Sequence, residues 1–87
     1  MSGHELARAL IAKHQVDRYP TTLRNLGKVT EELGELWGAI LKEKGDEAIR
    51  KEYADVGLAL YALGGKLGLD LDECMRHVVD NETRTFA

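Results

Sequence analysis

The sequence predicts an all-α protein of four helices. Apolar residues recur at helical spacing through most of the chain, and capping residues with glycine or proline separate these periodic stretches. No stretch reads as a strand. With 87 residues, no linker and no repeat, the chain is expected to form a single domain, residues 1–87. The connections are short, which favours antiparallel neighbours.

The first two helices are separated by a proline. Ser2 and Glu5 make a capping-box signature, and helical spacing continues to about Arg18. Residues 19–22, Tyr-Pro-Thr-Thr, should interrupt the helix because proline lacks a donor and restricts its predecessor. Either threonine can then cap a second helix, predicted from about Leu23 to Lys42.

The last two helices are separated by Gly68. After the second helix, Gly45 suits a left-handed C-terminal position and Asp46 suits the next N-cap. The third helix is predicted over residues 47–67 and ends at Gly68. Asp70 then begins the fourth helix in an acidic version of the capping box.

Composition narrows the class of protein. With 44% hydrophobic residues, 31% charged residues and a net charge of −3, the chain is typical of a soluble globular protein. Its 12 basic residues are scattered, so we expect no nucleic-acid polymer as a partner. No apolar run approaches the roughly 18 residues of a membrane span. The absence of a secretory pattern at the start, together with the lone Cys74, predicts a cytoplasmic protein.

The apolar face of the second helix is expected to be core. Val29, Leu33 and Trp37 lie in one arc of that helix, and Trp37 is expected to pack rather than stack on a ligand. Tyr53 on the third helix is also expected to pack rather than stack on a ligand. A chain this short builds a marginal core alone, which predicts a homodimer or homotetramer.

Two acidic pairs carry the chemistry. Glu32 and Glu35 are three residues apart on the second helix, and Glu52 and Asp55 are three apart on the third. Such pairs project from one helix face, so two antiparallel helices can close a cage of oxygens. After Asp55 the third helix is apolar all round, which places this pair beside the core. An uncompensated carboxylate there costs several kcal/mol or takes up a proton, so a bound cation is the simplest explanation.

The type of ligand indicates the metal. Carboxylates without histidine or thiolate favour Mg²⁺, with Mn²⁺ as an alternative, and a phosphate-bearing substrate commonly shares such an ion. The competing interpretation is a solvated acidic face, in which Lys28 pairs with Glu31 or Glu32. The protein would then be a non-enzymatic helical interaction module, with its third helix as a dimer seam.

These motifs resemble those of a known superfamily. Glu31-Glu32-Leu33-Gly34-Glu35 followed by Glu52-Tyr53-Ala54-Asp55 is similar to the EExxE and ExxD motifs of the MazG-like all-α nucleoside triphosphate pyrophosphohydrolases. The tail Asn81-Glu82-Thr83-Arg84 adds to the resemblance, which covers residues from about 14 to 86.

The resemblance implies Mg²⁺-dependent cleavage of a nucleoside triphosphate between its α and β phosphorus atoms, giving monophosphate and pyrophosphate. It implies dimers, or dimers of dimers, around a four-helix bundle. The Asn81 and Arg84 tail favours the general nucleotide branch, and the alternative is a phosphoribosyl-ATP pyrophosphohydrolase. The roles carried over are metal binding, orientation of water or a second ion, and contact with phosphate or sugar. Metal binding is carried over to Glu32, Glu35, Glu52 and Asp55. The orientation of water, or binding of a second ion, is carried over to Glu31. Contact with phosphate or sugar is carried over to Lys28, Asn81 and Arg84.

Overall fold

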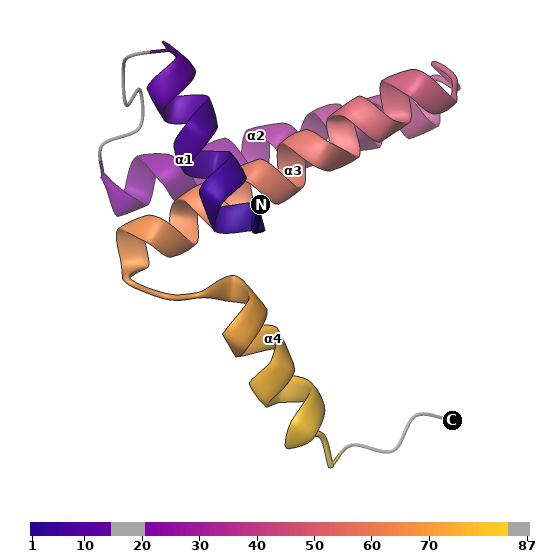
Figure 1. The fold of residues 1–87 in the computed structure, drawn as a ribbon. Coiled ribbons are helices and arrows are strands. Elements are labelled where there is room, and N and C mark those ends of the chain that lie inside the picture. The colour runs from indigo at the N-terminus through magenta and orange to yellow at the C-terminus, as the bar shows by residue number, and fades with distance from the viewer. Residues whose placement is uncertain (15–20, 84–87) are drawn as a thin grey trace.

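The computed structural model describes residues 1–14 and 21–83, and this part of the chain consists of four helices with no strand (Figure 1). The helices are α1 (Gly3–His14), α2 (Thr22–Leu41), α3 (Asp46–Leu67) and α4 (Leu71–Asp80). The predicted all-α class is therefore confirmed. The expected end of the first helix near Arg18 lies outside the described residues.

Local capping chemistry begins three of the helices as the sequence predicts. Before α1, Ser2 and Glu5 each donate a backbone N–H to the other's side chain, at 3.3 and 3.1 Å. Thr21 caps α2 by accepting from the backbone of Arg24 at 3.1 Å. Asp70 caps α4 by accepting from the backbone of Glu73 at 3.0 Å. Each side chain satisfies a donor that the first helical turn leaves unpaired.

The turn between α2 and α3 differs from the prediction by one residue. Gly45 is the N-cap of α3, with φ +96°, and Asp46 is the first residue of the helix rather than its cap. The left-handed residue after α2 is Glu43, with φ +49°. Glycine is suited to the N-cap here because a side chain would be strained at that φ, while the Asp46 charge still complements the helix dipole.

The other three helices are arranged around α3, which contacts each of them. Figure 1 shows α2 and α3 running side by side as an antiparallel pair, with α1 lying across them and α4 pointing away from the end of α3. The two halves of the acidic motif are therefore carried by the two helices that pack most closely. None of the helices in the described ranges is long and apolar enough to cross a bilayer.

The face of α2 that packs against α3 is its polar face. The buried residues of α2 are Asn25, Glu32 and Ala39, which are spaced seven apart. Most of the apolar arc lies outward, with Leu33 54% and Trp37 68% exposed, whereas Val29 is half-buried. Tyr53 on α3 is 71% exposed. The expectation that these two aromatic residues pack is therefore wrong within one chain, because none of the described elements covers that side of the helix pair.

The single chain leaves an unusually large surface. Within residues 1–14 and 21–83, the buried hydrophobic residues are three alanines, Ala7, Ala39 and Ala59, one from each of α1, α2 and α3. The accessible surface is 6895 Å² for a mass of 9.7 kDa, whereas a compact monomer of this mass exposes about 5,100 Å². Large hydrophobic side chains contribute to this surface, among them Leu23, Trp37 and Leu41, each at least two-thirds exposed. A surface of this kind is typical of a protein that buries it against another chain.

Candidate metal centre

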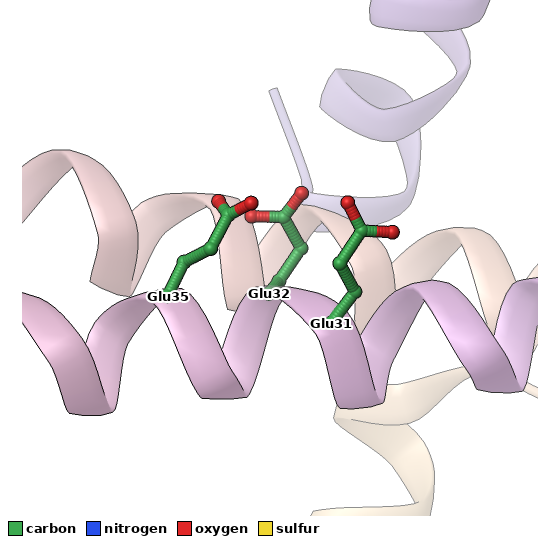
Figure 2. Close-up of side chains that lie close together, drawn as sticks. All are labelled: Glu31, Glu32 and Glu35. Carbon is green, nitrogen blue, oxygen red and sulfur yellow. The ribbon is translucent and has the colours of Figure 1, made fainter.

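Three glutamates from α2 gather on one side of that helix. One carboxylate oxygen from each of Glu31, Glu32 and Glu35 lies within 4.8 Å of the others. Figure 2 shows their side chains rising from the same side of α2, with the carboxylates of Glu32 and Glu35 next to each other. The spacing accounts for this, because residues three and four apart on a helix are neighbours.

A second group joins α2 to α3. Oxygens of Glu32, Glu52 and Asp55 also lie within 4.8 Å of one another. Glu32 belongs to both groups, so it is the residue through which the two halves of the motif meet. The antiparallel packing of α2 on α3 therefore brings together the acids that the sequence placed on separate helices.

The carboxylates at the centre of these groups are shielded from water. Glu32 is only 7% exposed. One oxygen of Glu32 and one of Glu52, both Oε2, are buried and have no hydrogen-bond partner among residues 1–14 and 21–83. A buried acceptor without a partner costs free energy. These two atoms are thus available to a ligand that carries positive charge.

Two lysines partly neutralise the acids. The Lys28 ammonium lies 2.7 Å from Glu32 Oε1 and 3.5 Å from Glu31 Oε1. The Lys51 ammonium lies 2.9 Å from Asp55 Oδ2, which raises the pKa of Lys51 through that hydrogen bond and the carboxylate charge. The pairing predicted for Lys28 is confirmed. The purely solvated acidic face is not what forms, since Glu32 is buried.

Repulsion among the acids remains in spite of the lysines. The charge of Glu32 is the largest cause that raises the pKa of Glu35, followed by burial and by the charge of Glu52. Carboxylates this close favour uptake of a proton or of a cation. The raised pKa of Glu35 therefore comes mainly from its neighbour Glu32 on the same helix, and the packing of α2 on α3 adds the smaller effect of Glu52.

The donor set fits a hard divalent cation. All five acidic side chains offer carboxylate oxygen, which Mg²⁺ and Mn²⁺ prefer, and neither histidine nor cysteine belongs to either group. The orphaned Oε2 atoms of Glu32 and Glu52 are the observation that tests the fit, because a cation would satisfy both. Glu32, Glu35, Glu52 and Asp55 are side chains that could hold such an ion.

The residues expected to contact substrate lie in different places. Lys28 is beside the acids, engaged with Glu31 and Glu32. Asn81 is the C-cap of α4, where its amide donates to the carbonyl oxygen of His77 at 2.9 Å. Because α4 points away from the other helices (Figure 1), a single chain does not bring Asn81 to the acids. Arg84 lies outside the described residues.

Lys51 is the member of the site that the sequence analysis missed. Its side chain contacts both acids of α3, with Nζ 3.6 Å from Glu52 Oε1 in addition to its bond to Asp55. A signal was present, because a lysine four residues before an aspartate on a helix commonly pairs with it.

Comparison with known proteins identifies the motif's family. A family model described as phosphoribosyl-ATP pyrophosphohydrolase matches residues 4–82, which include all of the acids above. The match also takes in α1 from its second residue, which the resemblance noted from the sequence did not cover. Neither the curated proteins nor the solved structures provide a match to the chain.

Proposed function

Because this chain belongs to the phosphoribosyl-ATP pyrophosphohydrolase family, we propose that it hydrolyses a phosphoribosyl-ATP-like nucleotide between the α and β phosphorus atoms. As a member it is a pyrophosphohydrolase, a hydrolase that acts on acid anhydrides. In the proposed reaction the oxygen of a water molecule bonds to phosphorus and the anhydride bond breaks. The products are the monophosphate and pyrophosphate, and the water proton passes to a base.

The family description favours the second of the two pyrophosphohydrolase alternatives weighed from the sequence. The Asn81 and Arg84 tail favours the general nucleoside triphosphate branch, but it does not outweigh a match along nearly the whole chain. A nucleotide substrate is common to both. The non-enzymatic interaction module is set aside, since the family is one of enzymes.

The observation that carries the proposed site is the convergence of acids where α2 packs on α3, with buried and unpartnered oxygens on Glu32 and Glu52. We propose that Glu32, Glu35, Glu52 and Asp55 hold Mg²⁺, with Mn²⁺ as a substitute. When bound, the ion would neutralise phosphate charge and lower the pKa of coordinated water.

Glu31 and Lys28 are proposed to work at the edge of this site. The Glu31 side chain is 54% exposed, so its carboxylate can reach a water molecule that the buried Glu32 cannot. Its role would be to orient that water and accept its proton. Lys28 holds Glu31 at 3.5 Å and supplies an ammonium that can also attract a phosphate oxygen.

A homodimer or homotetramer completes the proposal. The outward apolar face of α2, with Leu33, Trp37 and Ile40 all more than half exposed, is the surface expected to pack against a second chain. Such packing would build a four-helix bundle from two copies of the α2 and α3 pair. Asn81 would reach substrate bound to the neighbouring chain, because the acids of its own chain are out of its reach. Arg84 is proposed to contact the same substrate.

The test is release of pyrophosphate from phosphoribosyl-ATP, measured with Mg²⁺, with Mn²⁺ and with a chelator. Asp55→Asn and Glu35→Gln should each lose at least about a hundredfold in kcat/KM, since even the residues behind a metal ligand commonly contribute ten- to a hundredfold. Glu47→Gln removes an exposed acid at the start of α3 and should keep parental activity. Undiminished hydrolysis by Asp55→Asn and Glu35→Gln would contradict the proposed site.

The same assay on a panel of triphosphates separates the two branches. If phosphoribosyl-ATP is the substrate, its kcat/KM should exceed that of ATP, dUTP and dCTP by at least about tenfold. Comparable or faster turnover of a simple triphosphate would restore the general nucleotide branch. Release of orthophosphate instead of pyrophosphate would contradict both.

A further inference from the structure

Lys51 is placed against the site in a way that none of the family motifs describes. Its ammonium bridges Asp55 Oδ2, at 2.9 Å, and Glu52 Oε1, at 3.6 Å, which are the two acids that α3 contributes. We propose that Lys51 is the resident counter-ion of the metal-free site, and that a divalent cation must displace it to bind Glu52 and Asp55. This inference rests on the proposed metal site.

Lys51 neutralises the acidic site incompletely. Lys51 reaches one oxygen of Glu52, while the other, Oε2, is buried with no partner in the described part of the chain. The Oε2 atom of Glu32, a residue 7% exposed, is in the same condition. Lys28, which pairs with Glu32, and Lys51 together bring two positive charges to a group of three carboxylates, so a divalent cation that contacts the inner oxygens in place of Lys51 has the advantage.

Lys51 can leave the carboxylates of Glu52 and Asp55 at little cost in free energy. Its side chain is 69% exposed, whereas that of Lys28 is 27% exposed. An exposed ion pair on a helix contributes little to stability, and the lysine stem can turn into water without opening a cavity. Lys28 is held by two acids of α2 and by its partial burial. Of the two lysines, Lys51 is therefore the one suited to exchange with a cation.

Two consequences follow in opposite directions. Without metal, Lys51 reduces repulsion between Glu52 and Asp55, so its loss should lower the thermal stability of the metal-free protein by a small amount. With metal, the ion must compete with the ammonium and then tolerate its positive charge nearby, so loss of Lys51 should tighten metal binding. A residue that only shields the fold would produce the first effect without the second.

The experiment titrates the full chain with Mn²⁺ and with Mg²⁺ in a calorimeter, in the absence of nucleotide, and records thermal unfolding in a chelator. In Lys51→Met the Kd for metal should fall roughly three- to tenfold, by loss of one opposing charge at close range, and the metal-free Tm should fall. Lys51→Arg keeps the cation and should stay within about twofold of the parent. If Lys51→Met does not fold without metal, Lys51→Gln is titrated in its place.

Arg50→Met is the matched control, because it removes the same charge from the neighbouring exposed position of α3. Its Kd should change less than twofold. An equal gain in affinity in Arg50→Met and Lys51→Met would overturn the proposal, since the effect would then be one of net charge. An unchanged Kd in Lys51→Met would overturn it as well. Failure of metal to bind the parent and every variant would remove the proposed metal site, and this inference with it.

Discussion

His4 accepts a hydrogen bond at Nε2 from the backbone N–H of Leu71, at 2.8 Å, and so joins the first turn of α1 to the first residue of α4. The His4 ring also packs edge-on against Tyr61, with 4.8 Å between ring centroids. The N–H groups of a first helical turn have no partner within the helix. For α4, one of them is satisfied from the opposite end of the chain.

Replacing His4 tests how far α4 depends on α1. His4→Phe keeps an aromatic ring beside Tyr61 but removes the acceptor for Leu71, which should cost about 1 kcal/mol. The backbone amides at the start of α4 should exchange with deuterium faster, while those of α2 stay protected. His77→Phe changes an exposed histidine further along α4 and should leave the start of the helix unaffected. Equal exchange in the parent and in His4→Phe would mean that the bond does not hold α4.

Alanine substitutions at two adjacent glycines near the end of α3, Gly64 and Gly65, should change the stability of the protein in opposite directions. A Cβ at Gly64 would lie 3.0 Å from His4 Cε1 and 3.0 Å from the Leu69 carbonyl oxygen, whereas at Gly65 it would meet open space. Gly64→Ala should therefore lower stability by about 1–2 kcal/mol through overpacking. Gly65→Ala should raise it by about 0.5–1 kcal/mol through helix propensity. Chemical denaturation of both variants measures the difference.

The result also tests why position 64 is occupied by glycine. A glycine within a helix can permit close approach of a second chain in a bundle, but the neighbours of Gly64 are His4 and Leu69 of the same chain. Gly57 and Gly65 have nothing near their would-be Cβ atoms within this chain. If Gly64→Ala changes the oligomeric state without lowering stability, Gly64 serves the contact between chains instead.

The Tyr61 hydroxyl should make the protein sensitive to alkali. It donates to Asp72 Oδ1 at 2.5 Å, and this bond, with burial and the charges of Asp72 and Asp70, raises the pKa of Tyr61 above 10.0. The folded state thus retains the proton more firmly than the unfolded state. Its contribution to stability is complete below pH 10 and is lost as pH rises through the raised pKa. In Tyr61→Phe the Tm should be lower at pH 8 and should fall less steeply above pH 10.

Tyr53→Phe is the control for this experiment. Tyr53 is 71% exposed, and the loss of its hydroxyl should leave the Tm and its alkaline slope unchanged. If Tyr61→Phe and the parent lose stability in parallel above pH 10, the bond to Asp72 is not the cause.

Glu35→Gln should stabilise the protein when metal is removed. The pKa of Glu35 is raised above 4.5, mainly by the charge of Glu32, so the folded state binds this proton more tightly than the unfolded state. Stability contributed by this group therefore falls as pH rises from 4.5 through the raised pKa. In a chelator at pH 7, Glu35→Gln should have a higher Tm than the parent and a flatter dependence on pH between 4 and 7.

Added Mg²⁺ should reverse that order, because the parent gains stability from a bound ion and Glu35→Gln gains less. Glu47→Gln, which lies in the first turn of α3 away from the acidic groups, should follow the parent in both conditions. If the parent remains less stable than Glu35→Gln in excess Mg²⁺, the acids do not bind Mg²⁺.

Rules that act over three or four residues were sufficient for the helices, most of their caps and the two acidic pairs. Ser2, Thr21 and Asp70 cap because their side chains reach the backbone of the next turn. Glu32 with Glu35, and Glu52 with Asp55, share a helix face because of the helical period alone. Lys51 obeys the same rule, so its contact with Asp55 was open to prediction.

Packing between helices was needed for the rest. The apolar arc containing Trp37 identified α2 as amphipathic, but the face turned to α3 is that of Asn25, Glu32 and Ala39. Glu32 consequently belongs to both acidic groups, and His4 meets Leu71. Such contacts join residues far apart along the chain, so they depend on the free energy of the whole arrangement of helices. Spacing within one helix carries no information about which neighbour each face will meet.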